Sequence, residues 1–523
     1  MYKKNFLFFY YTILFFLILA FTYFESSKRD YTSIIDFDLT VIHNSLQVIS
    51  GQYPDYRDHT AYSLFLTYGI FYKLFSFFDN NLIINISNLV KSDNPEISLQ
   101  KFYLISRYIN SLIIFIFIIF FNKVLIFFHL DKKYIIISNF FLLLSESIVR
   151  NFVILRADIL AVCLFFIAFY FLLNFSKSYH IKNIFFFSIS MVLSLLAKVQ
   201  IIFLFYFVII FFIFYEYIEK RDLNLIIVKK KLIFSKLLNY NFKYLLLSFI
   251  FCYFCFQFVI NIFINSSSKI GYFDFFIFLI YFFSIFLILK FLFKNNKIFK
   301  NYFYIFFSLL LIFSLFTLFF FKVLNFLNIL NVDFNILLSV VNPFYFLKSY
   351  SSFSNKNFSS YIVYEMIKVF FFDFKFNLIY SLFLFYICFH CIYEFLYNLK
   401  FNNYFFYIFK ICLFIFALIA INNFRYNPLY EIYIFPLFIF MILIYIKIIS
   451  KKFKFLFISL FTLFFVINFY NNLSEYKLSL YAPSNHNVIC TNKKVRDFYF
   501  VWAKNFNENF FKKVCFNKNL LFR

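Results

Sequence analysis

The chain of 523 residues is 64% hydrophobic and only 14% charged, and its formal net charge at pH 7 is +26. Soluble domains carry about 25% charged residues, so this composition excludes an ordinary soluble protein and indicates a polytopic integral membrane protein. The 28% of aromatic residues does not require a nucleic-acid partner, because Phe, Lys, Asn and Ile share A/T-rich codons and genome bias explains their excess.

Apolar runs long enough to cross the hydrocarbon layer as helices recur along the chain. When the basic loops are placed in the cytoplasm, about thirteen spans result, with the N-terminus inside and the C-terminus outside. Thr60 to Phe78 is apolar enough to span, but a span there would move the basic cluster at Lys229 to the outside. We therefore predict that this segment is an amphipathic helix in the membrane interface. The predicted spans cover residues 6–24, 104–122, 134–150, 159–175, 183–197, 199–215, 244–264, 272–293, 302–321, 376–397, 404–421, 431–449 and 455–471.

The predicted fold class is all-α integral membrane. Residues 1–470 form a polytopic transmembrane domain with a large first outer loop over 25–103, and residues 471–523 form a short extracytoplasmic C-terminal tail. Cys490 and Cys515 lie in this polar tail and could form a disulfide if the tail lies outside the cytoplasm. His390 and Glu394 are one helical turn apart within an apolar segment, and we interpret them as contacts between helices.

The first outer loop concentrates acidic residues, and carboxylates at a membrane surface can act as a general base or bind a cation. Residues 39–49 have partly helical apolar spacing, which would place Asp36 and Asp38 at a helix N-terminus, where their charged form is stabilised. Gly51 and Pro54 predict a defined turn. The alternative is that an exposed loop is simply polar and acidic. The acidic and histidine residues of the loop include Asp30, Asp36, Asp38, His43, Asp55, Asp58 and His59.

Three later segments place polar residues next to predicted outer turns. Arg156-Ala157-Asp158 opens a helix, Ala197-Lys198 lies between two helices, and the segment from Arg425 to Pro436 contains Tyr430 at a helix start. The alternative for Arg156 and Asp158 is an interfacial ion pair that contributes little. The alternative for Lys198 and Arg425 is that their charges extend toward lipid headgroups.

In this order the motifs resemble those of the GT-C glycosyltransferases, which include lipid A aminoarabinose transferases, protein O-mannosyltransferases and lipopolysaccharide core transferases. In that family an Asp, often in an Asp-Glu pair, opens a helix in the first outer loop, and a Gly-x-x-Pro turn and an Asp-His-Pro-Pro-Leu stretch follow. Asp36 stands fifteen residues before the turn Gly51-Gln-Tyr53-Pro54. Asp58-His59-Thr60-Ala61 replaces the last stretch and lacks its prolines. Asp38 replaces the paired Glu with an offset of one position.

The resemblance implies a GT-C architecture with amphipathic helices in the first outer loop, in a bacterial plasma membrane with the active site facing the periplasm or exterior. It implies inverting transfer of a sugar from a polyprenyl-phosphate donor to a hydroxyl of a glycan, lipid or protein acceptor. No cofactor is specified, although a divalent cation is compatible with the acidic loop. The implied catalytic residues are Asp36 and Asp38, and the implied substrate-binding residues are Asp58, His59, Arg156, Asp158, Lys198, Arg425 and Tyr430.

Two other functions fit many helices and basic residues at a membrane. A transporter or flippase of lipid-linked sugars predicts paired repeats and helices broken by Gly or Pro, and the sequence has three Gly, six Pro and no detectable repeat. A polysaccharide polymerase differs mainly in lacking the early acidic loop. The sequence therefore favours the transferase.

Overall fold

A computed structural model describes residues 2–28, 38–52, 54–55, 61–178, 180–198, 432–448 and 503–516, with isolated positions between 201 and 497. Every regular element in these ranges is a helix, which confirms the all-α prediction for this part of the chain. Pro95–Phe127 and Ala157–Phe175 are long and apolar enough to cross a membrane, and shorter apolar helices cover Phe8–Phe24 and Phe435–Ile446. The predicted spans at 199–215, 244–264, 272–293, 302–321, 376–397, 404–421 and 455–471 lie wholly or largely outside the described residues.

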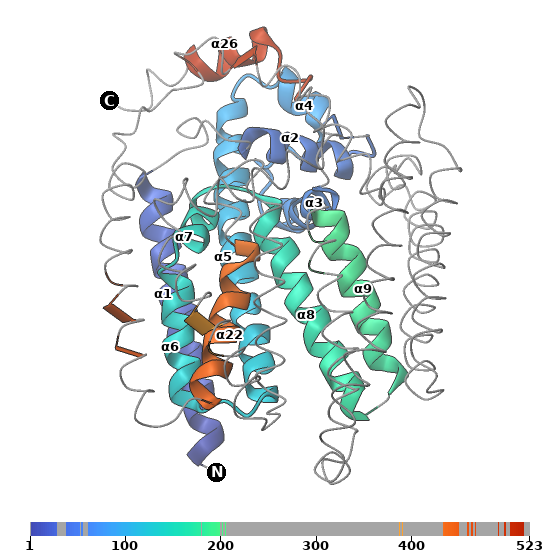
Figure 1. Ribbon diagram of the computed structural model, residues 1–523. Coiled ribbons are helices and arrows are strands. Elements are labelled where there is room, and N and C mark those ends of the chain that lie inside the picture. The colour runs from blue at the N-terminus through green and yellow to red at the C-terminus, as the bar shows by residue number, and fades with distance from the viewer. Residues whose placement is uncertain are drawn as a thin grey trace, which may run out of the picture.

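The long apolar helices form a bundle, and two shorter helices cross one end of it (Figure 1). The crosswise helices are α2 (Asp38–Ile49), which lies across the bundle end, and α3 (Tyr62–Ser76), which Figure 1 views nearly along its axis. The basic loops at 123–133 and 177–182 lie at the opposite end, together with the N-terminus (Figure 1). The bundle helices are α1 (Tyr2–Lys28), α5 (Pro95–Phe127), α6 (Lys132–Leu143), α8 (Ala157–Ser178), α9 (Ile181–Ala197) and α22 (Phe435–Ile448).

Helix α5 extends beyond the predicted span at 104–122. Its 33 residues correspond to about 50 Å at 1.5 Å per residue, whereas the hydrocarbon layer is about 30 Å thick. Pro95 occupies the first turn, where its missing N–H costs nothing. The added turns lie near α2 and also contact the short helix α4 (Ile86–Lys91), which the Asn85 side chain caps by accepting from two backbone N–H groups. The extension is thus the support on which the crosswise helices rest.

The prediction of one continuous span over 134–150 is wrong. Helix α6 ends at Leu143, and a separate helix α7 (Glu146–Val153) begins after a break at Leu144 and Ser145. The Ser145 hydroxyl donates to the Leu142 carbonyl at 2.6 Å and accepts from the Ile148 N–H at 3.4 Å. Such local side-chain bonds compete with the continuous helical pattern and explain the break.

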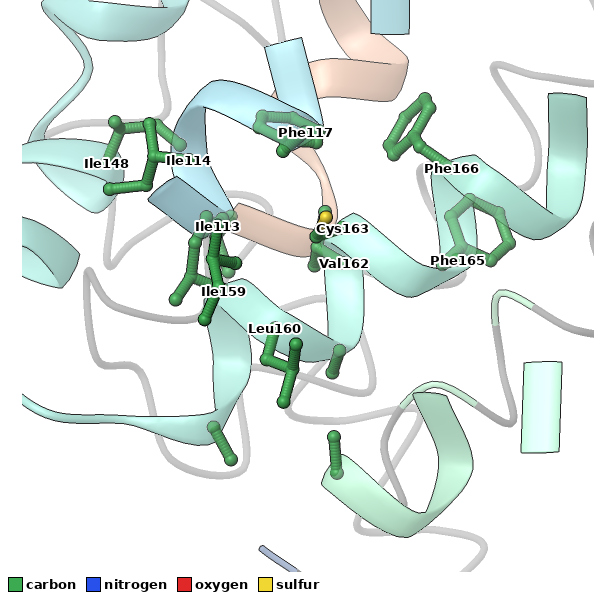
Figure 2. Packing of buried hydrophobic residues seen from close by; sticks show 14 of the residues in the cluster. Ile113, Ile114, Phe117, Ile148, Ile159, Leu160, Val162, Cys163, Phe165 and Phe166 are labelled. Carbon is green, nitrogen blue, oxygen red and sulfur yellow. The ribbon is translucent and has the colours of Figure 1, made fainter. Parts of the chain in front are cut away.

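The core of the bundle lies between α5 and α8, where rings and branched side chains interlock (Figure 2). Phe117 and Phe166 meet edge to face with ring centroids 5.4 Å apart. On the other side of α8 the small residue Ala161 allows α9 to approach closely, and Ser194 donates to its carbonyl at 2.6 Å. This packing holds the start of α8 and the end of α9 next to each other.

Polar side chains also join the apolar helices. Asn122 donates to the Tyr11 hydroxyl at 3.1 Å, and the Tyr445 hydroxyl of α22 lies 2.7 Å from His390 Nδ1. Hydrogen bonds of this kind hold helices together where the surroundings are apolar. The interpretation of His390 as a contact between helices is confirmed, whereas Glu394 lies outside the described residues.

At Gly69, α3 lies close to α2. A Cβ atom there would clash with Ile49 Cγ2 and lie 3.1 Å from the Ser45 carbonyl oxygen. We expect Gly69→Ala to lower the free energy of unfolding by about 2 kcal/mol through overpacking. Thermal unfolding in detergent measures this loss, and Ile70→Ala, at a half-exposed position on the same helix, is the matched control. An unchanged midpoint in Gly69→Ala would contradict the close approach.

Candidate active site at the crosswise helix

Asp38 lies in the first turn of α2 and is fully buried. Its Oδ1 accepts a hydrogen bond from the backbone N–H of Leu155 at 2.8 Å. The bond joins the first outer loop to the turn before α8, 117 positions along the chain. The N-terminal end of α2 also favours a negative charge at this position.

The predicted helix over residues 39–49 is confirmed, but its environment differs from a half-exposed surface helix. Every residue from Asp38 to Val48 is buried, including the polar ones. Helices α3, α4 and α5 pack around it, and Phe506 of the C-terminal tail contacts the His43 ring with centroids 4.7 Å apart. The sequence of α2 has only partly helical apolar spacing because several different elements, rather than one apolar layer, cover the helix.

Two buried tyrosines of α3 lie near Asp38. Burial raises the pKa of Tyr68 well above its usual value, and the neighbouring Tyr72 and the Asp38 charge raise it further. The Tyr68 hydroxyl donates to Asn110 Oδ1 at 2.5 Å, and the Tyr72 hydroxyl is hydrogen-bonded to Ser106. Asn110 in turn donates to backbone carbonyls of the segment before α8. A continuous set of buried hydrogen bonds therefore connects α3, α5 and the turn that holds Asp38.

Arg107 lies in the same turn of α5 as Ser106 and Asn110, the two residues that bind the tyrosines of α3. It is fully buried, and its guanidinium carbon lies 5.3 Å from the centre of the Tyr103 ring. Sequence reasoning missed this residue. The available signal was an arginine inside an otherwise apolar run, which is a functional candidate by default.

A second polar group surrounds Asp158 at the start of α8. Arg156 Nε donates to Oδ2 at 2.9 Å, and Lys198 Nζ lies 3.9 Å from Oδ1. The Tyr433 hydroxyl donates to Oδ1 at 2.5 Å. The side chains of Arg156, Asp158 and Lys198 are at most 10% exposed, so neither an exposed ion pair nor a lysine extended away from the protein describes them.

The two polar groups meet at one turn. Leu155, whose N–H binds Asp38, directly precedes Arg156, whose guanidinium binds Asp158. Tyr433 lies in the late segment between Arg425 and Pro436, and sequence reasoning did not single it out as a site residue. Four segments far apart in the sequence thus converge at the bundle end that carries α2 (Figure 1).

The turn after α2 forms as predicted. Gly51 has a φ of 73°, a value that glycine adopts without strain. The Asp55 N–H donates to Gln47 Oε1 at 2.9 Å, and Gln47 Nε2 donates back to Asp55 Oδ2 at 3.1 Å. His43 Nε2 lies 3.9 Å from the same Oδ2. Burial lowers the pKa of His43 to about 3, so its ring is neutral at pH 7.

The structure places four of the nine predicted site residues, and it brings all four to this bundle end. Within the described ranges no group of three or more His, Cys, Asp or Glu side chains could hold a metal ion. The placed residues are Asp38, Arg156, Asp158 and Lys198, and the residues outside the described ranges are Asp36, Asp58, His59, Arg425 and Tyr430.

Comparisons with protein-family models, curated proteins and solved structures find no match to this chain.

Loss of the buried Asp158 should destabilise the protein more than loss of the surface residue Asp79. In Asp158→Ala, Arg156 and Lys198 lose a buried counter-ion, and we expect the free energy of unfolding to fall by about 3 kcal/mol. Asp79→Ala removes an acid that pairs with Lys101 at the surface, and we expect little change because water already solvates both charges. Unfolding midpoints in detergent measure both effects. Equal midpoints for the two variants would contradict the burial of the Asp158 cluster.

Proposed function

We propose that this protein is a polytopic membrane glycosyltransferase that moves a sugar from a polyprenyl-phosphate donor to an extracytoplasmic acceptor hydroxyl. The observation that carries the proposal is the Asp38–Leu155 hydrogen bond. It joins the acidic loop to the Arg156-Ala157-Asp158 motif, and Lys198 and Tyr433 complete the same site. A transferase of this class needs a carboxylate base for the acceptor and cations for the lipid phosphate. The arrangement supplies the cations, and the proposed base is Asp36, which stands two positions before Asp38 in the sequence.

Several features support a membrane location with the site on the outer side. Two helices are long and apolar enough to span, and α1 exposes large apolar side chains that lipid would cover, among them Phe8, Phe16 and Leu17. Cys490 and Cys515 form a disulfide in the tail, and disulfides persist mainly outside the reducing cytoplasm. The tail docks at the end that carries α2 (Figure 1), whereas the basic loops at 123–133 and 177–182 lie at the other end, as the positive-inside rule requires.

The reaction is a single displacement with inversion at the anomeric carbon. The Asp36 carboxylate accepts the proton of the acceptor hydroxyl while the acceptor oxygen forms a bond to that carbon. The bond from the carbon to the phosphate oxygen breaks, and its electron pair leaves with the polyprenyl phosphate. No nucleotide site is required, because the donor enters from the lipid.

Asp38 has a different role from Asp36 in this proposal. It is buried and holds the Leu155 N–H, so it positions the start of α2 rather than accepting the proton. Its charge also stabilises positive charge that develops on the sugar, as carboxylates do in glycoside hydrolysis.

The cations around Asp158 suit the leaving phosphate, whose negative charge grows as the bond breaks. Arg156, Lys198 and Asp158 together carry a net charge of +1 and are held by α8 and α9. Asp158 and the Tyr433 hydroxyl fix where these cations point. Such preorganisation lowers the cost of rearrangement during the reaction. Arg425 and Tyr430 would approach the phosphate from the late motif, and Asp58 and His59 would contact the acceptor.

Replacement of the proposed base tests the function. We expect Asp36→Asn to lower the transfer rate by about a hundredfold or more, because the amide cannot accept the proton. Asp38→Asn should lose less activity, since its amide oxygen still accepts from Leu155. The measurement is transfer of radiolabelled sugar from polyprenyl-phosphate donors in membranes that contain equal amounts of each variant.

Asp79→Asn, at a partly exposed acid outside the site, is the matched control and should transfer at the wild-type rate. Transfer at that rate by Asp36→Asn would contradict the assignment. Movement of the donor across vesicle membranes with no transfer would instead favour a carrier.

A further inference from the structure

The C-terminal tail makes direct contacts with the turn that follows α2. The Lys504 backbone N–H donates to Asp55 Oδ2 at 3.0 Å, across 449 positions of the chain. The same oxygen accepts from Gln47 Nε2 of α2 at 3.1 Å. One carboxylate oxygen therefore joins α2, its following turn and the tail.

The tail also covers α2 directly. Phe506 is fully buried and meets the His43 ring edge to face, and it stacks on Phe510 with centroids 4.3 Å apart. Because the His43 ring is neutral at pH 7, no charge has to be desolvated for this contact. The contact contributes to the burial of His43.

A disulfide closes this covering segment. Cys490 and Cys515 are joined, so the contacts at Lys504 and Phe506 lie within a closed loop that includes most of helix α26 (Glu508–Phe516). Phe510, Phe511 and Val514 form the buried face of α26, whereas Lys512 and Glu508 lie on its exposed face. Figure 1 shows α26 beside α4, above the end of the bundle that carries α2. A short segment with so little core of its own depends on a cross-link to keep this shape.

We propose that the disulfide-closed C-terminal tail is a positioning element of the candidate active site, which holds Asp55 and His43 and thereby fixes α2 and Asp38. The inference rests on the proposed function for its catalytic readout only. Phe506 and Lys504 touch no reacting atom; they act through α2. Reduction of the disulfide loosens the closed loop, frees α2 to move and misplaces the Asp38 carboxylate.

Hydrogen exchange tests the positioning without any assay of transfer. We expect backbone amides of residues 39–49 to exchange about tenfold faster or more in Phe506→Ala and in the double variant Cys490→Ser with Cys515→Ser. Lys512→Ala, on the exposed face of α26, is the matched control and should exchange as the wild type does. Amides of residues 113–121, in the core of α5, should stay protected in all variants and show that the bundle is intact. Unchanged exchange of residues 39–49 in both tail variants would overturn the proposal.

Transfer kinetics provide the second readout. We expect kcat to fall by about tenfold in Phe506→Ala, because small misplacements of a reacting group are costly, while KM for the donor changes less than twofold. A loss confined to protein yield, with kcat of the purified variant unchanged, would mean that the tail is only structural and would overturn the proposal. If the wild type shows no transfer, the proposed function fails, and hydrogen exchange alone decides whether the tail holds α2.

Discussion

The hydrogen bond between Asp38 and the Leu155 N–H is the interaction on which the arrangement of the site depends. A carboxylate buried without a partner is strongly unfavourable, so the bond determines where the start of α2 can lie. The same bond requires the segment before α8 to direct the Leu155 N–H toward α2. That turn then places Arg156 and Asp158 at the same bundle end, and the close packing of α8 on α9 adds Lys198.

Burial of so many polar groups has a cost that the fold offsets with specific partners. Asp158 has a guanidinium, an ammonium and a phenol around it, and Tyr68 and Tyr72 bind polar groups of α5. Buried ion pairs contribute little net stability relative to an apolar replacement. Their grouping at one end of an otherwise apolar bundle fits the proposed function, which needs charges held in fixed positions within a water-poor site.

The sequence allowed the helical character of the described residues to be predicted, and it named four polar residues that the structure brings together. Long apolar runs predicted helices α5 and α8. Gly51 predicted a turn, because glycine adopts the positive φ that this turn requires. The residues of α3 are apolar enough to span the membrane. Its crosswise placement was predicted only because a span there would move the basic cluster at Lys229 to the outside. Asp38 was a candidate because the first outer loop concentrates acidic residues, and Asp158 and Lys198 were candidates because they lie next to predicted outer turns. The structure brings these three residues to one bundle end.

The missed features have two different causes. The break at Ser145 is local: polar residues Glu146 and Ser147 follow it, and the Ser145 hydroxyl bonds to Leu142 and Ile148. The other missed features depend on long-range contacts that no local pattern encodes. Tyr433 resembles many other tyrosines in a chain with 43 of them. The contact between Phe506 and His43, which covers α2, joins residues far apart in the chain. The sequence indicated only that His43 belongs to a polar loop.

The central claim is that the site around Asp38 and Asp158 faces outward, and the sidedness of two exposed positions tests it most directly. Single cysteines would replace Gln52, next to the site, and Lys133, in the first turn of α6 at the other end. The background would keep the Cys490–Cys515 disulfide and lack the other cysteines. We predict that a membrane-impermeant thiol reagent labels position 52 in intact cells and position 133 only after permeabilisation. Labelling of position 133 from outside, with position 52 protected until permeabilisation, would place the site in the cytoplasm and contradict the account.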